Sequence, residues 1–561
     1  MASSSAAAAA VTASSVREDR EEEDRAEERA LTGFLSDDTL LHIMRCLSTR
    51  ELLSSLAFVC HRWHRLCTSI LVYELVPCPL NSSKRPWGNL RRKRLLELAV
   101  THAPTLERVH LHGLKRIKSK DVIALCQSLP KLHDLSIISC PDFETTDLEL
   151  TANHLPQQLI SLDIHRDHVI GFPCTVNDKI LANIHQRCPR LEKLDLDLCS
   201  EITWQGLDGL LQACQLLTSL DLHSQLLGWP EVAQVFKSCK YLRHFSLVSP
   251  RLIPQISGSS DDHEIRGRAT KQWSRGGLCS SSEISLGVQM PKQLTSIRLY
   301  SSPHRSVPLE FPPMYEILFS NGHQLRQLHA QGLFNTSWEM ISVWCTNLKL
   351  LDLTHFSQNS LILTRSEEFV LCGLFHLLKQ LEHIALPSAT DRILTELGRF
   401  GANLREIRFL DTNSRNTAVT DKGVVAVAEG CPDLRVLSLS GCHNLTISSA
   451  RALAFHCRKL EVLILSRCDK FTDAAVAALL PRLNSSLILL DLIGCQITQS
   501  SLEALQQYAK VTSLRVVAIA KALWQRSQSV IADIHGCNPR LRIRNESGIV
   551  WDGFYHGTVI S

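Results

Sequence analysis

The apolar positions along most of the chain follow one recurring pattern. Four clear copies are CPRLEKLDLDLCSEIT, CPDLRVLSLSGCHNLT, RKLEVLILSRCDKFT and SSLILLDLIGCQIT. They share L-x-x-L-x-L-x-x-C, followed closely by an apolar residue and Thr, and many copies begin 26 or 27 residues apart. A fixed period of this length indicates one stack of similar units and not a set of independent domains. The copies begin at Leu106, Leu132, Leu159, Leu191, Leu217, Leu242, Leu294, Leu325, Leu348, Leu381, Leu404, Leu434, Leu460, Leu487 and Leu514.

The pattern predicts one strand and one helix in each copy. In the copy that begins at Leu434, Leu437 and Leu439 are two positions apart, so both side chains point to the same side of a short strand. Cys442 follows where the chain turns, and a small buried thiol there can bond the backbone weakly. The next Thr can cap a helix, as at Thr203, Thr446 and Thr472. We therefore predict an α/β fold, a leucine-rich-repeat horseshoe solenoid with parallel strands inside and helices outside.

Residues 35–67 have a different pattern, with the spacing of packed helices. Ser36 can cap a first helix, and Ser48 with Glu51 forms a capping box for a second. The first apolar face comprises Leu40, Ile43, Met44 and Leu47, and the second comprises Leu52, Leu56, Val59 and Trp63. A unit of about 35 residues cannot bury both faces alone, so we expect it to bind a partner.

The cysteine-bearing copies resemble the leucine-rich repeats of intracellular F-box proteins, and residues 35–67 resemble an F-box. The F-box pattern of Leu-Pro, an apolar face and V-C-x-x-W is matched except at Ser36, where the family usually has Pro. The resemblance implies a small all-α F-box ahead of the solenoid, docked on a Skp-family adaptor. The adaptor-binding residues that it implies are Leu35, Leu40, Ile43, Met44, Leu47, Leu52, Leu56, Val59 and Trp63.

An F-box followed by repeats of this type resembles the substrate receptors of cullin-based ubiquitin ligases. The resemblance implies the substrate-recognition subunit of an SCF-type ligase, which binds the adaptor, through it a cullin, and an unidentified protein substrate on the concave face. Such a subunit supplies proximity and no catalytic group. The alternative is a scaffold whose repeats bind proteins and whose F-box acts outside a ubiquitin ligase.

The predicted domain boundaries follow shifts in composition. Residues 1–31 are an Ala/Ser-rich and then charged tail that we expect to be disordered. Leu242 and Leu294 are separated by twice 26 residues. The intervening segment is either a degenerate coil with EISLGV as its strand or a flexible insertion. We favour the insertion, at about 254–290. The other predicted segments are an F-box at 32–70, a proline-containing linker at 71–94, the solenoid at 95–541, and a tail or cap at 542–561.

Charge and composition narrow the expected partners. The chain has 60 Lys and Arg against 56 Asp and Glu, so its net charge of +4 does not indicate binding to nucleic acid or a membrane surface. No signal peptide and no apolar run long enough for a bilayer is present, so the twenty cysteines are expected to be reduced. We expect a location in the cytoplasm, the nucleus or both. The stretch KRPWGNLRRKR, residues 84–94, is either a nuclear import signal or a solvated linker.

No catalytic or metal-binding motif in the sequence favours a different function. Cys60, His64 and Cys67 could face one side of a helix, but no fourth zinc ligand is nearby, and an F-box helix explains the same positions. Phosphate-binding loops, G-x-S-x-G and H-E-x-x-H are absent from the sequence. We therefore expect no enzyme activity, no metal and no cofactor.

The outward positions of the strands provide the candidate substrate-binding residues. In the early copies they are polar, and the candidates are His112, Asp163, His165, Asp195, Asp197, Asp221 and His223. In the late copies they are apolar, at Val436, Val462, Ile464, Leu489, Ile493 and Val516, of which Val462 and Leu489 are also candidates. An apolar patch needs a cover or a ligand. Residues 545–561 could fold back over it, or they could cap the last coil.

Overall fold

The structure is a computed structural model that describes most of the repeat region. The described residues are 74–75, 106–112, 117–138, 140–165, 175–196, 201–223, 226–248, 291–300, 312–330, 341–353, 365–386, 388–409 and 416–545. The chain divides into two compact units: unit 1 is residues 1–198 with 212–216, and unit 2 is residues 199–211 with 217–561. The predicted F-box helices and the tail beyond residue 545 lie outside the described residues.

Unit 1 contains a parallel ladder of strands that alternate with helices. Its strands are β1 (Glu74–Leu75), β2 (Arg108–His112), β3 (Asp134–Ile138), β4 (Ser161–His165) and β5 (Lys193–Leu196). Its helices are α6 (Ser119–Ser128), α7 (Thr145–Ala152) and α8 (Asp178–Arg187). Each strand pairs with the next in chain order, from β1 to β5. The division between the units passes through α9 (Trp204–Ala213).

Unit 2 continues the same alternation over most of its length. Its main ladder comprises β6 (Ser219–His223), β7 (His244–Val248), β8 (Ser296–Tyr300), β9 (Gln327–Ala330), β10 (Leu350–Asp352), β11 (His383–Leu386), β12 (Glu406–Phe409), β14 (Val436–Ser438), β16 (Val462–Ile464), β17 (Leu489–Asp491), β18 (Val516–Ala518) and β19 (Arg542–Arg544). All neighbouring pairs are parallel. A separate parallel pair joins β13 (Asn416–Thr420) to β15 (Cys442–Asn444).

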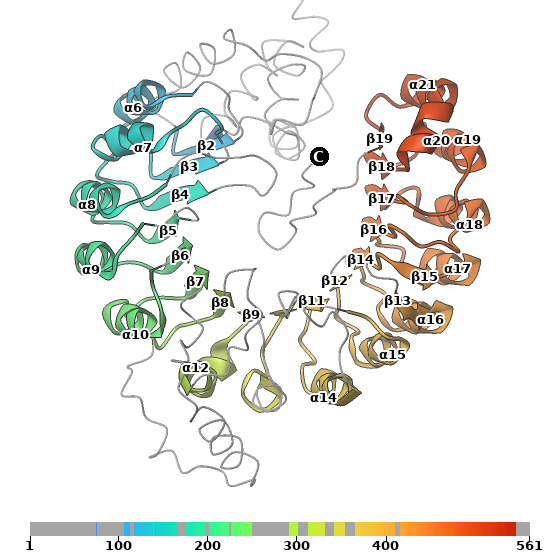
Figure 1. The fold of residues 1–561 in the computed structure, drawn as a ribbon, viewed down its shortest axis with the longest axis horizontal. Helices are drawn as coiled ribbons and strands as arrows, with labels where there is room; N and C mark the ends of the chain where they lie inside the picture. Colours follow the sequence, from blue (N-terminus) through green and yellow to red (C-terminus); the bar gives the residue numbers. More distant parts are fainter. Residues whose placement is uncertain are drawn as a thin grey trace, which may run out of the picture. The chain divides into compact units, whose positions relative to one another are not determined.

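The helices of unit 2 lie on the side of the coils away from the main ladder (Figure 1). They are α10 (Trp229–Ser238), α12 (Pro312–Asn321), the 3₁₀ helix η3 (Gly322–Gln324), α14 (Arg365–Phe375), α15 (Asp391–Phe400), α16 (Asp421–Gly430), α17 (Ile447–His456), α18 (Asp473–Leu483), α19 (Gln499–Tyr508), α20 (Lys521–Arg526) and α21 (Gln528–Cys537). Among the described helices, none has both the length and the apolar character required to cross a bilayer.

The core of each coil is the one that the leucine pattern predicts. All fifteen opening leucines are buried, with at most 4% of their surface exposed. The turn cysteines also behave as expected: the Cys140 thiol donates to the Leu111 carbonyl at 3.4 Å, and Cys468 donates to Leu439 at 3.4 Å. None of the described cysteines forms a disulfide. The α/β leucine-rich-repeat fold is therefore confirmed.

The ladder differs from the predicted boundaries at its ends. Arg542–Arg544, placed by the sequence in a tail or cap, form β19 and pair with β18. Glu74–Leu75, placed in the linker, form β1 and pair with β2. The pattern missed these two strands because neither segment carries the full L-x-x-L-x-L spacing: Arg540 stands three positions before Ile543, and Pro77 stands two positions after Leu75. In the middle, β7 pairs directly with β8, so no further strand of this ladder lies between them.

Aspartates at the starts of the late helices connect successive coils. Asp421 accepts hydrogen bonds from the backbone N–H and the hydroxyl of Thr446 in the next coil, at 2.8 and 2.5 Å. Asp391 binds Thr420, and Asp473 binds Thr498, in the same way. We call each such contact an Asp–Thr clamp.

Two of the predicted helix caps differ in their hydrogen bonds. Thr446 caps its own helix by accepting from the N–H of Ser448 at 3.3 Å, as predicted. Thr472 is at the N-cap of α18 but accepts no capping hydrogen bond. It also has no clamp, because the residue that corresponds to Asp421 in the preceding coil is Ile447.

Candidate protein-binding surface

The polar outward side chains of unit 1 form a row across its ladder. The register places His110 beside Ser136, Ser136 beside Asp163, and Asp163 beside Asp195. His110 Nδ1 is 2.9 Å from the Ser136 hydroxyl. Because the positions alternate with buried leucines, the parallel register alone brings these polar groups together.

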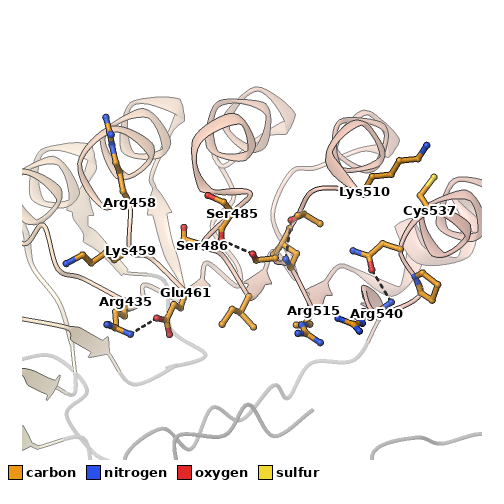
Figure 2. A pocket seen from close by; sticks show the side chains of 16 residues that line it. Arg435, Arg458, Lys459, Glu461, Ser485, Ser486, Lys510, Arg515, Cys537 and Arg540 are labelled. Atoms are coloured by element: carbon orange, nitrogen blue, oxygen red, sulfur yellow. Dashed lines mark hydrogen bonds and ion pairs between the residues drawn. The ribbon is translucent and has the colours of Figure 1, made fainter. Parts of the chain in front are cut away.

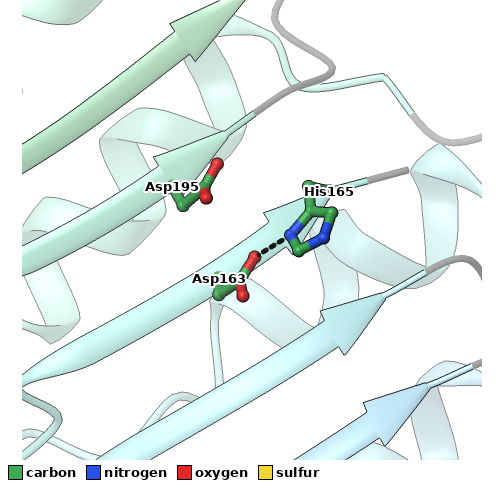
Figure 3. Close-up of side chains that lie close together, drawn as sticks. All are labelled: Asp163, His165 and Asp195. Carbon is green, nitrogen blue, oxygen red and sulfur yellow. Dashed lines mark hydrogen bonds and ion pairs between the residues drawn. The ribbon is translucent and has the colours of Figure 1, made fainter. Parts of the chain in front are cut away.

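The end of this row brings together three of the predicted substrate-binding residues. Nδ1 of His165 is 2.5 Å from the Asp163 carboxylate, and Asp195 approaches from the neighbouring strand (Figure 3). One ligand atom from each of the three lies within 4.8 Å of the others. This spacing resembles a metal-ligand set, but the hydrogen bond between Asp163 and His165 accounts for their approach, and we assign no metal here. The half-buried cluster offers two carboxylates and an imidazole to a polar or basic partner.

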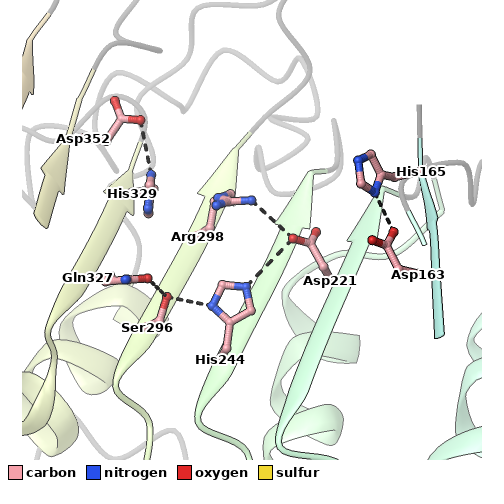
Figure 4. A network of polar contacts seen from close by, with 9 residues as sticks. All are labelled: Asp163, His165, Asp221, His244, Ser296, Arg298, Gln327, His329 and Asp352. Atoms are coloured by element: carbon pink, nitrogen blue, oxygen red, sulfur yellow. Dashed lines mark hydrogen bonds and ion pairs between the residues drawn. The ribbon is translucent and has the colours of Figure 1, made fainter. Parts of the chain in front are cut away.

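A second polar row crosses the first strands of unit 2. Its successive register partners are Asp221, Ser246, Arg298, His329 and Asp352. The Arg298 guanidinium donates to Asp221 at 3.2 Å (Figure 4). Ser246, Arg298, His329 and Asp352 are all at most 7% exposed. This row is therefore a paired internal network and not an open charged surface.

The electrostatics of this row fix the charge of Asp221. Burial alone would raise the pKa of its carboxyl, but a hydrogen bond from His244 and the charge of Arg298 lower that pKa to about 2. Asp221 is therefore ionised at neutral pH, and its charge is balanced within the network. The predicted role of Asp221 in binding a substrate is not supported by this position, since its carboxylate is already engaged.

His329 and Asp352 form the other end of the same row. His329 Nδ1 lies 3.2 Å from the Asp352 carboxylate. Burial lowers the pKa of His329, and the nearby Arg298 acts in the same direction, whereas Asp352 raises it. The net effect is a lowered pKa, so the imidazole is neutral at pH 7. Its sequence position, outward on a coil with a weak leucine pattern, explains why it was not among the predicted residues.

A parallel row runs two positions earlier along the strands. His244 Nδ1 is 2.7 Å from the Ser296 hydroxyl, which donates to Gln327 at 3.0 Å. Further along, His383 Nδ1 is 2.9 Å from the Glu406 carboxylate. Polar groups therefore recur along this row as far as β12, interrupted at β10 by the buried Leu350.

The same row becomes apolar from β14 onward, as the sequence predicts. Val436, Val462, Leu489 and Val516 are successive register partners and pack into one cluster, with Ile464 beside it. The apolar patch, which the sequence predicted to need a cover or a ligand, is buried at its centre, because Val462 and Leu489 have no exposed surface. As described, these two candidates present no side chain to a substrate.

The remaining predicted residues have different outcomes. His223 is half-buried on β6, and His112 ends β2. Asp197 and all the predicted adaptor-binding residues, from Leu35 to Trp63, lie outside the described residues. His110, His244, Arg298 and Asp352 were missed, although the outward positions of their coils could have identified them.

A family model matches the segment that precedes the repeats. Residues 37–76 match the F-box-like family. Comparison with curated proteins gave no match. Among solved structures, the Rad7 and Elc1 complex in yeast has a TM-score of 0.34 and 14% identity, over 97% of this chain and 93% of that chain. A leucine-rich-repeat protein of Leptospira interrogans has a TM-score of 0.32 and 14% identity, over 80% and 91%.

These structural similarities are low, so the fold assignment depends on the coils themselves. The buried leucines, turn cysteines and parallel ladders are observed directly in both units. The F-box-like match falls on the segment whose apolar faces predicted a partner. The chain therefore combines a segment that matches the F-box-like family with a series of leucine-rich-repeat coils.

Proposed function

We propose that this protein is the substrate-recognition subunit of an SCF-type ubiquitin-protein ligase. The observation that carries the proposal is the F-box-like match at residues 37–76, directly ahead of a long array of repeats. In this role the F-box docks on a Skp-family adaptor, and through it on a cullin. The chain supplies no catalytic group, and it acts in the cytoplasm, the nucleus or both.

The array is suited to holding a protein because it offers polar groups in fixed positions. The cluster of Asp163, His165 and Asp195 is the best-supported contact surface, since its carboxylates lie side by side on rigid strands. Such a surface favours a basic or hydrogen-bonding segment of the substrate. Holding that segment near a ubiquitin-conjugating enzyme raises its effective concentration, which is the whole contribution of a receptor.

The test compares the full chain with a variant that lacks residues 35–67. Both are tagged and recovered from cells, and the recovered proteins are identified by mass spectrometry. The proposal expects the adaptor, a cullin and ubiquitylated substrate with the full chain, and loss of the adaptor and cullin from the deletion variant while substrate binding persists. Recovery of the adaptor without any cullin would replace the ligase role with that of a scaffold.

A further inference from the structure

A basic hollow lies along the edge of unit 2 where helices lead into strands. It encloses about 880 Å³ over the last coils (Figure 2). Among the described residues that line it, Glu461 is the one acidic residue and none is aromatic. Six cationic side chains line it: Arg435, Arg458, Lys459, Lys510, Arg515 and Arg540. All six are exposed. We call this feature the basic edge.

The repeat register explains why the cations gather there. Arg435, Glu461, Ile488 and Arg515 each immediately precede a strand, and the backbone ladder places them in successive coils. Parallel strands are spaced by about 4.8 Å, so the hollow extends over roughly 14 Å from Arg435 to Arg515. It is an elongated surface and not a compact pocket for a small molecule.

Most of this positive charge has no counterpart within the described chain. Arg435 pairs with Glu461 at 2.8 Å, and Lys459 pairs with Asp433 at 2.5 Å. Arg458, Lys510, Arg515 and Arg540 form no ion pair with a described acidic side chain. The net charge of the entire chain is only +4, so this concentration is local. Like charges held together repel, and an anion placed between them relieves the repulsion.

The lining limits the chemistry of the anion. Single-stranded nucleic acids bind through bases stacked on aromatic side chains, which this hollow does not offer. Membrane surfaces are bound through apolar side chains beside the cations, and of the described lining residues only Ile488 and Leu514 are large and aliphatic. Guanidinium groups match carboxylate and phosphate oxygens in a two-point geometry. A linear segment with regularly spaced anionic side chains fits the length of the hollow and its donors.

We propose that the basic edge binds an acidic segment of a partner protein, through the side chains of Asp, Glu or phosphorylated residues. This interaction surface is separate from the polar rows on the strands. It does not rest on the proposed ligase function, because it requires neither the F-box nor a cullin. The contact is expected to be salt-dependent, since every contributing cation is exposed.

The test uses the full chain and fluorescent peptides in anisotropy titrations at about 0.1 M salt. The probes are a repeat of Asp-Glu-Ser, a phosphoserine-containing repeat of Asn-Gln-Ser, and the same neutral repeat without phosphate. The variant Lys510→Glu/Arg515→Glu/Arg540→Glu reverses three cations of the hollow. The matched control, Lys422→Glu/Arg451→Glu/Lys521→Glu, makes the same change of charge at exposed positions outside the lining.

The proposal expects binding of at least one anionic peptide and none of the neutral one. The hollow variant should weaken this binding about tenfold or more, and the control by less than about twofold. The two anionic probes distinguish carboxylate from phosphate as the source. If the triple variant does not fold, Lys510→Gln/Arg515→Gln makes the same comparison by neutralising two cations.

Three outcomes would overturn the proposal. Equal weakening by the hollow variant and the control would show that only net charge matters. Equal binding of the neutral peptide would exclude an electrostatic site. In the third outcome, neither anionic peptide binds, but duplex DNA or phosphatidylserine vesicles do, and the hollow variant loses that binding. The basic edge would then bind a different class of ligand.

Discussion

The carboxylate of Asp421 accepts hydrogen bonds from both the backbone N–H and the hydroxyl of Thr446, 25 residues further along the chain. The same carboxylate accepts from the N–H and the hydroxyl of Ser449. One side chain at the start of α16 therefore satisfies several donors at the start of α17. Coils that are joined by packing of leucines are also joined by polar contacts at this edge.

Removing that carboxylate should destabilise the array. In Asp421→Ala the Thr446 and Ser449 donors lose their acceptor, and we expect the free energy of unfolding to fall by about 1–3 kcal/mol. Urea unfolding measures this change, and amide exchange should rise first in α17. Asp433→Ala is the control, because Asp433 makes only an exposed pair with Lys459, which solvent screens. Equal losses in the two variants would contradict the assigned role of the clamp.

The effect of an Asp–Thr clamp on stability can be tested by introducing one at Ile447, where it is missing. In Ile447→Asp the new carboxylate would occupy the position of Asp421 one coil later, within reach of Thr472. The expected result is a gain of about 0.5–1.5 kcal/mol in the free energy of unfolding, as for a restored helix cap. The double variant Ile447→Asp/Thr472→Val should lose this gain. A gain that persists in the double variant would mean that Thr472 is not the partner.

The clamps also predict how the fold responds to acid. Burial would raise the pKa of Asp421, but hydrogen bonds from Ser449 and Thr446 lower it below 3.8, and Asp473 behaves likewise. A lowered folded-state pKa contributes stability that is present above the unfolded value and lost as the pH falls through the folded one. Stability measured by urea unfolding should therefore decline as the pH falls below about 4. Asp421→Asn should show a shallower decline, and an unchanged slope would contradict this account.

The polar clusters of the two units should respond differently to charge reversal. Asp163→Lys/Asp195→Lys alters a half-buried surface, so we expect loss of substrate recovery, by tenfold or more, with little change in thermal stability. Asp221→Lys places a cation beside Arg298 and should destabilise unit 2 by roughly 3–5 kcal/mol. Pull-down and thermal unfolding of both variants separate the two effects. Undiminished substrate recovery by the first variant would move the binding surface elsewhere.

The predicted F-box surface can be tested without a structure of that segment. Replacing Leu40, Ile43 and Trp63 with Ala removes apolar anchors that can each contribute about 2 kcal/mol to binding. Binding of a purified Skp-family adaptor, measured by calorimetry, should fall by orders of magnitude. The cooperative unfolding of the repeats should remain. A folded triple variant that binds the adaptor as tightly as the native chain would refute the assignment of this face.

The sequence was most informative where side chains repeat with the fold. Leu434, Leu437 and Cys442 could be placed because each recurs at the same position of every strong copy. The pairing of Asp221 with Arg298 could not be predicted, since the two are 77 residues apart and meet only through the register of three strands. Val462 was correctly placed on the outward row, but outward position does not determine exposure, and its burial depends on neighbours that the pattern does not name.

The Asp–Thr clamps have a consequence for how such a chain tolerates rearrangement. The coil that contains Thr420 and Asp421 carries both halves of the contact, a Thr for the coil that precedes and an Asp for the coil that follows. Deleting or duplicating one whole coil between Asp391 and Thr446 therefore leaves every remaining Asp facing a Thr. A deletion of half a coil breaks this relation. In this part of the array, the number of coils can therefore change by one whole repeat while the contacts between neighbouring coils stay the same.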